Sequence, residues 1–415
     1  MILVQNHRLR LSGNRILAVV LLLSFLASCA PKVLRPGGGK GVKQPSKEAS
    51  EKEKEVSEET EVKAPINFNN IALLLPFQLD RVIDSLPNRT DVERAGLALD
   101  FYQGFKLGLN RLAVQGDNFK LHVLDTRDNV AEVQRIAADK EVAESQLVIG
   151  PIFPTEINAF SSTANLAGKL QISPLAASSP SRYQVNNLVT VTPPIEVHAR
   201  LISKHLAAKY GAGDQVIIFT NQDEDSKKLL DPLKIALDKL HVIYKEVEEL
   251  GDIEMSLGAS GKNVLINAST NQYFVAPLIA SLFRLKTEAG YDISLIGHPN
   301  WTKLDLNPDY LLELNTCVSS SYYIDEGNGE VKDFRNNYFS SFKVPPSEFA
   351  YKGYDTGLFF GRLLAKYPKG YAEQLVKEKH KGISIGFEFV HDSASGYVNN
   401  SVRLLRFDGK GYRPL

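Results

Sequence analysis

Cysteine and long apolar runs are scarce in this chain, and each scarcity excludes a class of protein. Two cysteines in 415 residues cannot staple a small disulfide scaffold, so stability must come from a hydrophobic core. The apolar run at residues 16–26 has 11 residues, whereas a helix needs about 20 to cross a bilayer core. No Cys/His cluster has zinc-site spacing, so we expect neither a metal nor a cofactor.

The first 29 residues have the pattern of an export signal. Three arginines within residues 8–15 precede the apolar run, and the tetrad Leu-Ala-Ser-Cys at residues 26–29 follows it directly. This tetrad resembles the lipobox of bacterial lipoproteins, which implies a signal peptide of residues 1–28 and a lipid on Cys29. The alternative is a plain secretory signal that contains a cysteine. Cys317 then remains as the one thiol, and its apolar surroundings predict a buried, inert side chain.

Residues 29–65 are expected to be the lipidated cysteine and a disordered, charged linker. Residues 32–47 carry five cations and no anion, and residues 48–63 carry seven Glu against three Lys. Almost none of these residues can build a core, which is typical of a solvated spacer. The remaining residues, 66–415, have a net charge near −4, which gives no sign of nucleic-acid binding.

About 350 residues remain for the folded part, more than one hydrophobic core usually holds, so two lobes are expected. Short apolar strands alternate with amphipathic helices, which favours an α/β fold with parallel sheets covered on both faces. The strands of the first series are expected at 71–77, 121–125, 146–150, 171–175 and 189–193, with helices at 93–112, 130–142 and 155–167. The second series has expected strands at 215–220, 241–247, 263–267 and 293–297, and helices at 198–210, 226–240 and 272–289. Two helical stretches in 331–367 and terminal strands at 383–389 and 401–407 complete the pattern.

The order of these elements resembles the type I periplasmic binding protein superfamily, the group of leucine/isoleucine/valine-binding proteins and receptor ligand-binding domains. The matching features are the strand ending in Leu-Pro-Phe at residues 75–77, the helix with Gly96, Phe105 and Gly108, and the motifs at 148–151, 172–175, 349–351 and 354–356. The resemblance implies two Rossmann-like lobes joined by a hinge. Lobe 1 is then residues 66–193 plus about 322–367, and lobe 2 is residues 194–321 plus about 383–415.

In such folds, ligands bind beyond the carboxyl ends of the strands, in the cleft between the lobes. Residues at these positions are the candidate ligand-binding residues, although ordinary loop roles compete for each of them. They are Phe77, Gln78, Gly150, Pro151, Ala177, Ser178, Ser179, Asn221, Asn267, Trp301, Tyr322 and Asp325. The resemblance implies that the hydroxyl groups in loop 176–179 hold the carboxylate of an amino acid; an acidic residue for the ammonium group cannot be assigned.

Two sequence patterns could indicate a catalytic or metal site, but the residues around each of them argue against it. Residues 382–386 match the Gly-x-Ser-x-Gly motif, but Ser384 lies in an alternating apolar run that predicts a strand, and a nucleophile elbow needs strand, turn and helix. His198 and His205 are seven residues apart on one helix, which favours two surface histidines over a metal site. An enzyme is therefore not expected.

Two functional hypotheses remain. In the first, a membrane-tethered binding protein captures a small polar, amino-acid-like ligand and passes it to an ABC permease or a sensor. In the second, the lobes form an interaction module of the cell envelope, such as a regulator of peptidoglycan synthesis. Ala30, and not Asp, follows Cys29, which favours the outer membrane if the host is Gram-negative.

Overall fold

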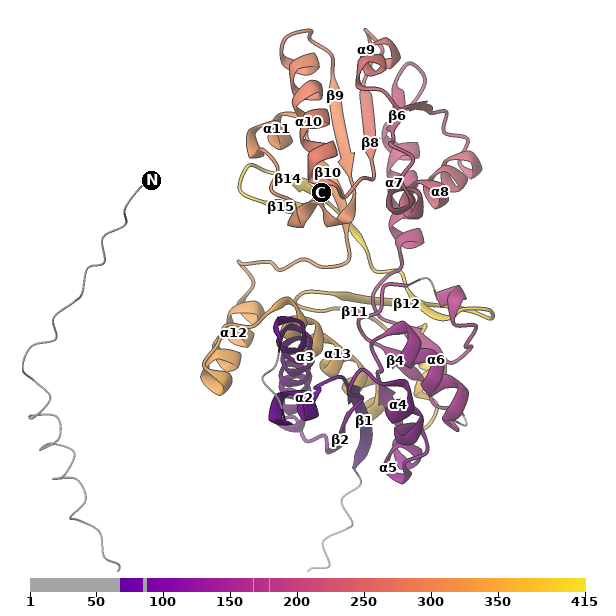
Figure 1. Cartoon of the computed structure of the whole chain (residues 1–415), viewed down its shortest axis with the longest axis vertical. Helices are drawn as coiled ribbons and strands as arrows, with labels where there is room; N and C mark the ends of the chain where they lie inside the picture. Colours follow the sequence, from indigo (N-terminus) through magenta and orange to yellow (C-terminus); the bar gives the residue numbers. More distant parts are fainter. Residues whose placement is uncertain (1–67, 85–87, 167, 179) are drawn as a thin grey trace, which may run out of the picture. The chain divides into compact units, whose positions relative to one another are not determined.

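The described part of the chain forms two α/β lobes, each built on one mixed sheet of mostly parallel strands. The computed structural model describes residues 68–415 except 85–87, 167 and 179 (Figure 1). The predicted signal peptide, Cys29 and the predicted linker lie outside the described residues. The expected α/β class with two Rossmann-like lobes is confirmed.

Lobe 1 has an eight-stranded sheet with the order β11-β12-β13-β5-β4-β3-β1-β2. The pairs among β1 to β5 are all parallel, and β13 also runs parallel to β5. The strands are β1 (Asn69–Leu75), β2 (Phe119–Asp125), β3 (Leu147–Ile149), β4 (Gln171–Ser173), β5 (Leu188–Thr190), β11 (Lys379–Lys381), β12 (Gly386–Asp392) and β13 (Gly396–Asn399). The helices are α2 (Leu79–Asp84), α3 (Arg89–Ala113), α4 (Val130–Ala137), α5 (Lys140–Glu144), α6 (Pro154–Thr163), α12 (Gly329–Phe342), α13 (Glu348–Lys366) and α14 (Tyr371–Gln374).

Strand β1 shows why this lobe needs apolar residues on both faces of its sheet. Successive side chains of a strand point to opposite faces. Ile71, Leu73 and Leu75 join the core that α3 and α13 cover, whereas Ala72 and Leu74 join the core that α4 and α6 cover. A continuous apolar strand is therefore the expected pattern for a central parallel strand.

Helices α3 and α13 pack with their backbones in close contact. A Cβ atom added at Gly104 would lie 1.9 Å from the carbonyl oxygen of Ala350, and one at Gly353 would lie 2.1 Å from that of Phe101. Glycine at these positions allows the two helices to approach to a distance that no other residue permits.

Lobe 2 has a seven-stranded sheet with the order β15-β14-β10-β9-β8-β6-β7. Strands β6 to β10 form parallel pairs, and β14 and β15 add antiparallel pairs at one edge. In Figure 1, α7 and α8 lie on one side of this sheet and α10 and α11 on the other. The strands are β6 (Gln215–Phe219), β7 (Lys245–Val247), β8 (Asn263–Asn267), β9 (Ile293–Gly297), β10 (Cys317–Ser320), β14 (Arg403–Phe407) and β15 (Tyr412–Pro414). The helices are α7 (Ile195–Lys209), α8 (Glu224–Lys239), α9 (Ile253–Ser256), α10 (Gln272–Thr287) and α11 (Pro308–Glu313).

The expected division of the C-terminal segment is wrong in part. Residues 383–415 were assigned to lobe 2 as a whole, but β12 and β13 join the sheet of lobe 1, and only β14 and β15 join lobe 2. The reason is the core of lobe 1, because Phe387 of β12 stacks on Phe359 of α13 with ring centroids 4.3 Å apart.

Two local expectations also need correction. The helix expected over 130–142 is two helices, because the Asp139 side chain accepts a hydrogen bond from the Glu141 N–H and caps a new helix. The strand expected over 241–247 is limited to β7. His241 has a left-handed φ of 56° in the turn that follows α8, and this conformation is incompatible with a strand.

Three segments connect the lobes, and Asn399 joins two of them. The connections lie between β5 and α7, between β10 and α12, and between β13 and β14. The Asn399 amide donates to the carbonyls of Val191 and Gly386 at 2.9 and 2.8 Å, and its oxygen accepts from the N–H groups of Glu388 and Ser401 at 3.0 Å. Every hydrogen-bonding position of this buried side chain is thus used.

None of the helices in the described ranges is both long and apolar enough to span a membrane.

Candidate ligand-binding cavity

A cavity of about 1190 Å³ is lined by residues of both lobes. Its walls come largely from loops that follow strands: Ala177 after β4, Thr192 after β5, Thr270 after β8 and His298 after β9. These loops lie where a ligand binds in open α/β sheets. The first turn of α13 and the segment between β10 and α12 supply further lining residues.

The charged groups of the cavity are close to balance. Its lining contains four Lys or Arg residues and three Asp or Glu residues, namely Lys228, Lys303, Lys352, Arg413, Asp225, Asp305 and Glu348. Lys352 and Lys303 both approach Glu348, at 2.5 and 3.4 Å, and Lys228 lies 2.6 Å from Asp225. Charges of both signs are therefore available to a zwitterionic ligand.

Glu348 lies in the first turn of α13 and Lys352 one turn further on. The Ser347 side chain caps this helix by accepting a hydrogen bond from the Phe349 N–H. Burial alone would raise the pKa of Glu348, but Lys352 and Lys303 together hold it below its usual value. The Lys352 ammonium also lies 5.5 Å from the centroid of the Tyr322 ring, within cation–π range. Burial raises the pKa of Tyr322, so its hydroxyl stays protonated and can donate a hydrogen bond.

Two histidines lie on the lobe 2 side of the cavity, and both are neutral at pH 7. Burial lowers the pKa of His198 and of His298 to about 4. His298 Nδ1 accepts a hydrogen bond from the Asn300 N–H at 3.0 Å, so the proton of the neutral ring is on Nε2. His198 is buried against Ser319, with 3.0 Å between Nδ1 and Oγ, so its interpretation as a surface histidine is wrong.

Among the described residues, no three His, Cys, Asp or Glu side chains gather as metal ligands would. What the cavity offers to a ligand is hydrogen bonds, charge and aromatic surface.

Comparison with known proteins gives the fold. No family model and no curated protein matches the sequence. Solved structures do match. A putative branched-chain amino acid ABC transporter protein from Rhodospirillum rubrum has a TM-score of 0.61 at 14% identity, covering 84% of this chain and 100% of that one. A substrate-binding protein of an ABC transporter from Desulfitobacterium hafniense, in complex with Leu, has a TM-score of 0.52 at 18% identity over the same shares.

The C-domain of LpoA from Haemophilus influenzae, described as a regulator of PBP1A, is similar to a comparable degree. Its TM-score is 0.56 at 13% identity, with 83% of this chain and 99% of that chain covered. The chain adopts the type I periplasmic binding protein fold. The resemblance that the sequence motifs indicated is thereby confirmed at the level of the fold.

Three of the predicted site residues line the cavity of this binding-protein fold: Ala177, Trp301 and Tyr322. Trp301 is only 1% exposed, and its indole Nε1 donates to the Ser269 carbonyl at 2.8 Å. It therefore packs in the lobe 2 core and presents only a small part of its surface to the cavity.

The lobe 1 candidates that follow β1 and β3 lie outside this cavity lining. Phe77 packs edge-on against Tyr102, with ring centroids 6.0 Å apart. Gln78 has a left-handed φ of 55° and is fully buried, while its N–H donates to Asp125 at 3.1 Å. Gly150 and Pro151 are buried too, and Gly150 lies so close to Leu74 that an added Cβ would be 2.1 Å from the Leu74 carbonyl oxygen.

The other candidates have local roles in the described structure. The Asn267 amide donates to the Phe219 carbonyl at 2.9 Å, and the Asn221 side chain accepts from Ser226. Asp325 accepts from the Gly327 N–H in an exposed loop. Ser178 is half-buried and is not part of the cavity lining, and Ser179 lies outside the described residues.

Ser384 of the Gly-x-Ser-x-Gly motif lies in a bend between β11 and β12, not within a strand as expected. Its hydroxyl donates to the buried Asp355 carboxylate at 2.6 Å, and the N–H groups of Ile383, Ser384 and Ile385 donate to the same carboxylate at 2.8–2.9 Å. Asp355 of α13 thus fixes the bend that leads into β12.

Sequence reasoning missed all of the charged lining. The residues it missed are Asp225, Lys228, Lys303, Asp305, Glu348, Lys352 and Arg413, together with His298. A signal was present for one pair: Glu348 and Lys352 are four residues apart at the start of a helix that follows Pro345-Pro346. Both residues of this pair line the cavity, so charged residues spaced by four at the start of that helix were the available signal.

Proposed function

We propose that the protein is an extracytoplasmic binding protein, tethered to the membrane by a lipid on Cys29, that captures a small polar ligand in the cavity described above. The observation that carries this proposal is the cavity itself, because its walls combine loops of both lobes with charges of both signs. It lies beyond strand ends, as ligand sites of doubly wound folds do.

The ligand class that fits best is an amino acid or a related zwitterion. Four cations and three carboxylates line the cavity, so a ligand with one charge of each sign can be paired without leaving a large excess. The ammonium group of a ligand would compete with Lys352 and Lys303 for Glu348. Its carboxylate would compete with Glu348 and Asp225 for Lys303 and Lys228, whose side chains are 68% and 69% exposed. The Tyr322 ring and the His298 Nε2–H group supply an aromatic face and a donor.

A thermal-shift screen of the full chain tests this proposal. Amino acids, short peptides, muropeptides and small carboxylates are added in turn, and the melting temperature is followed. A ligand at 100 times its Kd stabilises the folded state by about 2.7 kcal/mol. One class of compound should raise the melting temperature by a few degrees, and Lys303→Ala and Lys228→Ala should weaken that effect.

Lys410→Ala is the matched control, because Lys410 is an exposed lysine of lobe 2 outside the cavity lining. A shift that survives in both cavity variants would place the ligand elsewhere. The absence of any shift would count against a working cleft.

The lipid tether is tested separately. Cys29→Ala should leave the leader uncleaved or release the protein from the membrane fraction, and mass spectrometry of the native protein should find an acylated N-terminal cysteine. Because Ala30 follows Cys29, the outer membrane is the expected location in a Gram-negative host. A native protein with a free thiol at residue 29 would contradict the tether.

A second candidate function is an interaction module of the cell envelope. It is supported by the likeness to the LpoA C-domain, whose TM-score of 0.56 lies between those of the two transporter proteins. If the ligand screen shows no shift and the full chain binds the PBP1A of its host in a direct binding assay, this second function is favoured.

A further inference from the structure

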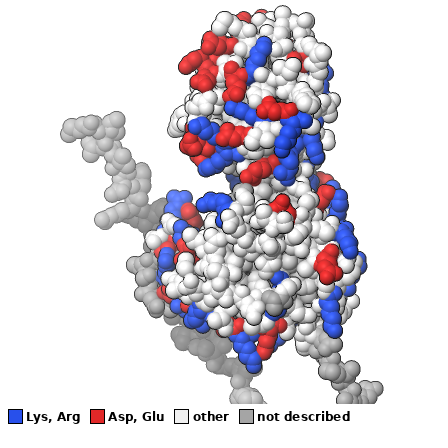
Figure 2. All heavy atoms as spheres, turned by 90° about the vertical axis from the view of Figure 1, so that its right-hand side faces the viewer, with Lys and Arg blue, Asp and Glu red and all other residues white. Residues whose placement is uncertain are grey.

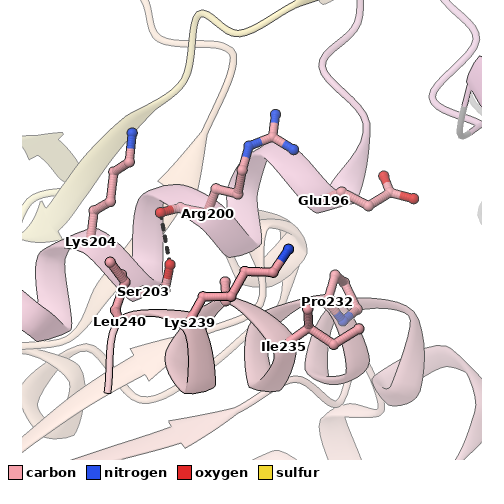
Figure 3. A pocket seen from close by; sticks show the side chains of 9 residues that line it. Glu196, Arg200, Ser203, Lys204, Pro232, Ile235, Lys239 and Leu240 are labelled. Carbon is pink, nitrogen blue, oxygen red and sulfur yellow. Dashed lines mark hydrogen bonds between the residues drawn. The ribbon is translucent and has the colours of Figure 1, made fainter. Parts of the chain in front are cut away.

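A groove on the surface of lobe 2 runs between α7 and α8, and its lining shares no residue with that of the cavity. It has a volume of about 310 Å³. Its lining consists of Glu196, Arg200, Ser203 and Lys204 from α7 and of Pro232, Ile235, Ala236, Lys239 and Leu240 from α8 and its end (Figure 3). Residues spaced by three, four, seven and eight lie on one face of a helix. Each helix therefore contributes one stripe, and the groove extends about 12 Å along both.

The floor of the groove is apolar and partly open to solvent. Ile235 is 56% exposed and Leu240 is 42% exposed, although both are large apolar side chains. Pro232, which precedes Ile235, and Ala236, which lies between Ile235 and Leu240 in the sequence, belong to the same apolar stripe of α8. Single exposed apolar residues are common, but a row of them in a concave site is typical of a docking surface.

The rim of the groove is basic. Arg200, Lys204 and Lys239 are all exposed, and within the described ranges none of the three has an ion-pair partner. Glu196 is the one acidic residue of the lining; in Figure 3 it lies at one end of the row and points away from the three cations. Figure 2 shows charges of both signs on this side of the molecule, with Lys and Arg side chains gathered on part of the upper lobe.

This local excess of positive charge contrasts with the chain around it. Residues 66–415 contain 37 Lys or Arg against 41 Asp or Glu, so the folded part is acidic on average. Elsewhere on α8, lysines are paired: Lys227 with Glu224, Lys228 with Asp225 and Lys234 with Glu246. The free cations thus border the apolar groove, where a partner can reach them.

We propose that this groove binds an acidic amphipathic helix of another protein. Two or three apolar side chains at i, i+3 or i+4, and i+7 would enter the groove, as in other helix-in-groove complexes. Asp or Glu residues beside them would pair with Arg200, Lys204 and Lys239. This site is separate from the cavity, and its occupation does not require the proposed ligand.

One contact of the rim connects the groove to the segment between the lobes. Arg200 donates to the Asn400 side chain at 3.0 Å, and Asn400 lies between β13 of lobe 1 and β14 of lobe 2. A carboxylate that competes for Arg200 would loosen this contact. Docking at the groove can therefore change how the connection between β13 and β14 is held.

The test measures binding of a fluorescein-labelled peptide to the full chain by fluorescence anisotropy. The probe is a helical peptide of about 16 residues, with leucines at i, i+4 and i+7 and glutamates on the adjacent positions. A second peptide replaces every glutamate with lysine. The acidic peptide should bind, and raising the salt from about 50 to about 300 mM should weaken it several-fold because the rim charges are exposed.

The double variant Lys204→Glu/Lys239→Glu should weaken the acidic peptide at least tenfold and bind the basic peptide better than the parent chain does. Ile235→Ser should weaken the acidic peptide, since it removes an apolar contact from a side chain that is 56% exposed. Lys369→Glu/Lys410→Glu changes the net charge equally at exposed positions outside the groove, and should leave binding unchanged.

Three outcomes would overturn the proposal. The acidic peptide does not bind; the groove variant and the control variant weaken it equally; or the parent chain binds phosphatidylglycerol vesicles through these same lysines while ignoring the peptide. The last outcome would make the groove a contact for an anionic lipid surface.

Discussion

Glu156 is a buried acidic residue whose environment makes the stability of lobe 1 depend on pH. It lies in the first turn of α6, is 1% exposed, and neither carboxylate oxygen makes a hydrogen bond of good geometry within the described part of the chain. Burial raises the pKa of Glu156 to about 7, and Asp128 nearby adds to the rise, while the Thr126 hydroxyl opposes it. The ordinary value for Glu in an unfolded chain is about 4.3.

Because the folded-state pKa is the higher one, the folded state binds the proton more tightly than the unfolded state does. The contribution of Glu156 to stability is therefore fully present below about pH 4 and is lost as the pH rises through about 7. We predict that Glu156→Gln, which mimics the protonated form, raises the free energy of unfolding at pH 8 by about 1–3 kcal/mol and changes it little at pH 4. Urea unfolding at the two pH values measures the difference.

Glu373→Gln is the control for this prediction, because Glu373 is exposed and its substitution should change the free energy of unfolding by less than about 0.5 kcal/mol. A loss of stability in Glu156→Gln at pH 8 would mean that the ionised carboxylate is satisfied in the folded protein.

At the scale of residues, the sequence predicted positions in the fold better than roles in the site. Gln78 follows β1 as expected, but the left-handed turn at this residue buries it, and no sequence pattern reveals that turn. Lys352 was not predicted, because its place in the cavity depends on where α13 begins relative to lobe 2. Trp301 was predicted at the cavity, and the competing role in core packing is also real.

The contact between α3 and α13 is the element-scale feature most sensitive to a single methyl group. Gly353 faces the Phe101 carbonyl, and an added Cβ would lie 2.1 Å from its oxygen, which is backbone and cannot rotate away. Gly96 lies on α3 with nothing within 4 Å of an added Cβ. Substitution by alanine is therefore expected to have opposite effects on stability at these two glycines.

We predict that Gly353→Ala lowers the free energy of unfolding by about 2–3 kcal/mol or more, because the helices must separate to relieve the clash. Gly96→Ala should raise it by up to about 1 kcal/mol, since alanine restricts the unfolded chain and favours the helix. Chemical unfolding of the two variants measures both effects. Equal effects of the two substitutions would show that helix propensity, and not close packing, governs these positions.

At the scale of elements, the sequence predicted the elements that are locally determined. The expected strand at 263–267 and the expected strand at 293–297 coincide with β8 and β9, because both are short runs of buried apolar residues. Strands β10, β11, β13 and β15 were not predicted. Their sequences, Cys-Val-Ser-Ser, Lys-His-Lys, Gly-Tyr-Val-Asn and Tyr-Arg-Pro, have little apolar signal, and they become strands through pairing with distant segments.

At the scale of the whole molecule, the two-lobe architecture could be predicted from length and from the repeated strand–helix alternation. The assignment of the last segment could not, because the chain returns to lobe 1 for β12 and β13 and then crosses to lobe 2 for β14 and β15. Two hairpin-like strands that follow one another in sequence give no sign of which sheet they join. Stacking of Phe387 on Phe359 decides the question, and that contact is long-range.

Asn399 links the third connection between the lobes, β13 to β14, with the first connection, β5 to α7. Its amide bonds Val191, at the start of the first connection, and its oxygen bonds the Ser401 N–H, within the third. Removing the side chain leaves buried backbone groups of both connections without a partner. We predict that Asn399→Ala lowers the free energy of unfolding by about 2–4 kcal/mol, as measured by chemical unfolding, whereas the exposed Asn336→Ala changes it by less than about 0.5 kcal/mol.

Hydrogen exchange tells whether that loss is local to the connections. Residues 191–195 and 399–403 should exchange faster in Asn399→Ala, while the buried strands β6 and β8 of lobe 2 keep their protection, because local opening at the connections leaves each lobe core intact. If ligand capture involves hinge motion, these connections must bend, and the variant should also change the ligand-induced thermal shift. A uniform rise in exchange across both sheets would instead mean that Asn399 supports the fold as a whole and has no special part in joining the lobes.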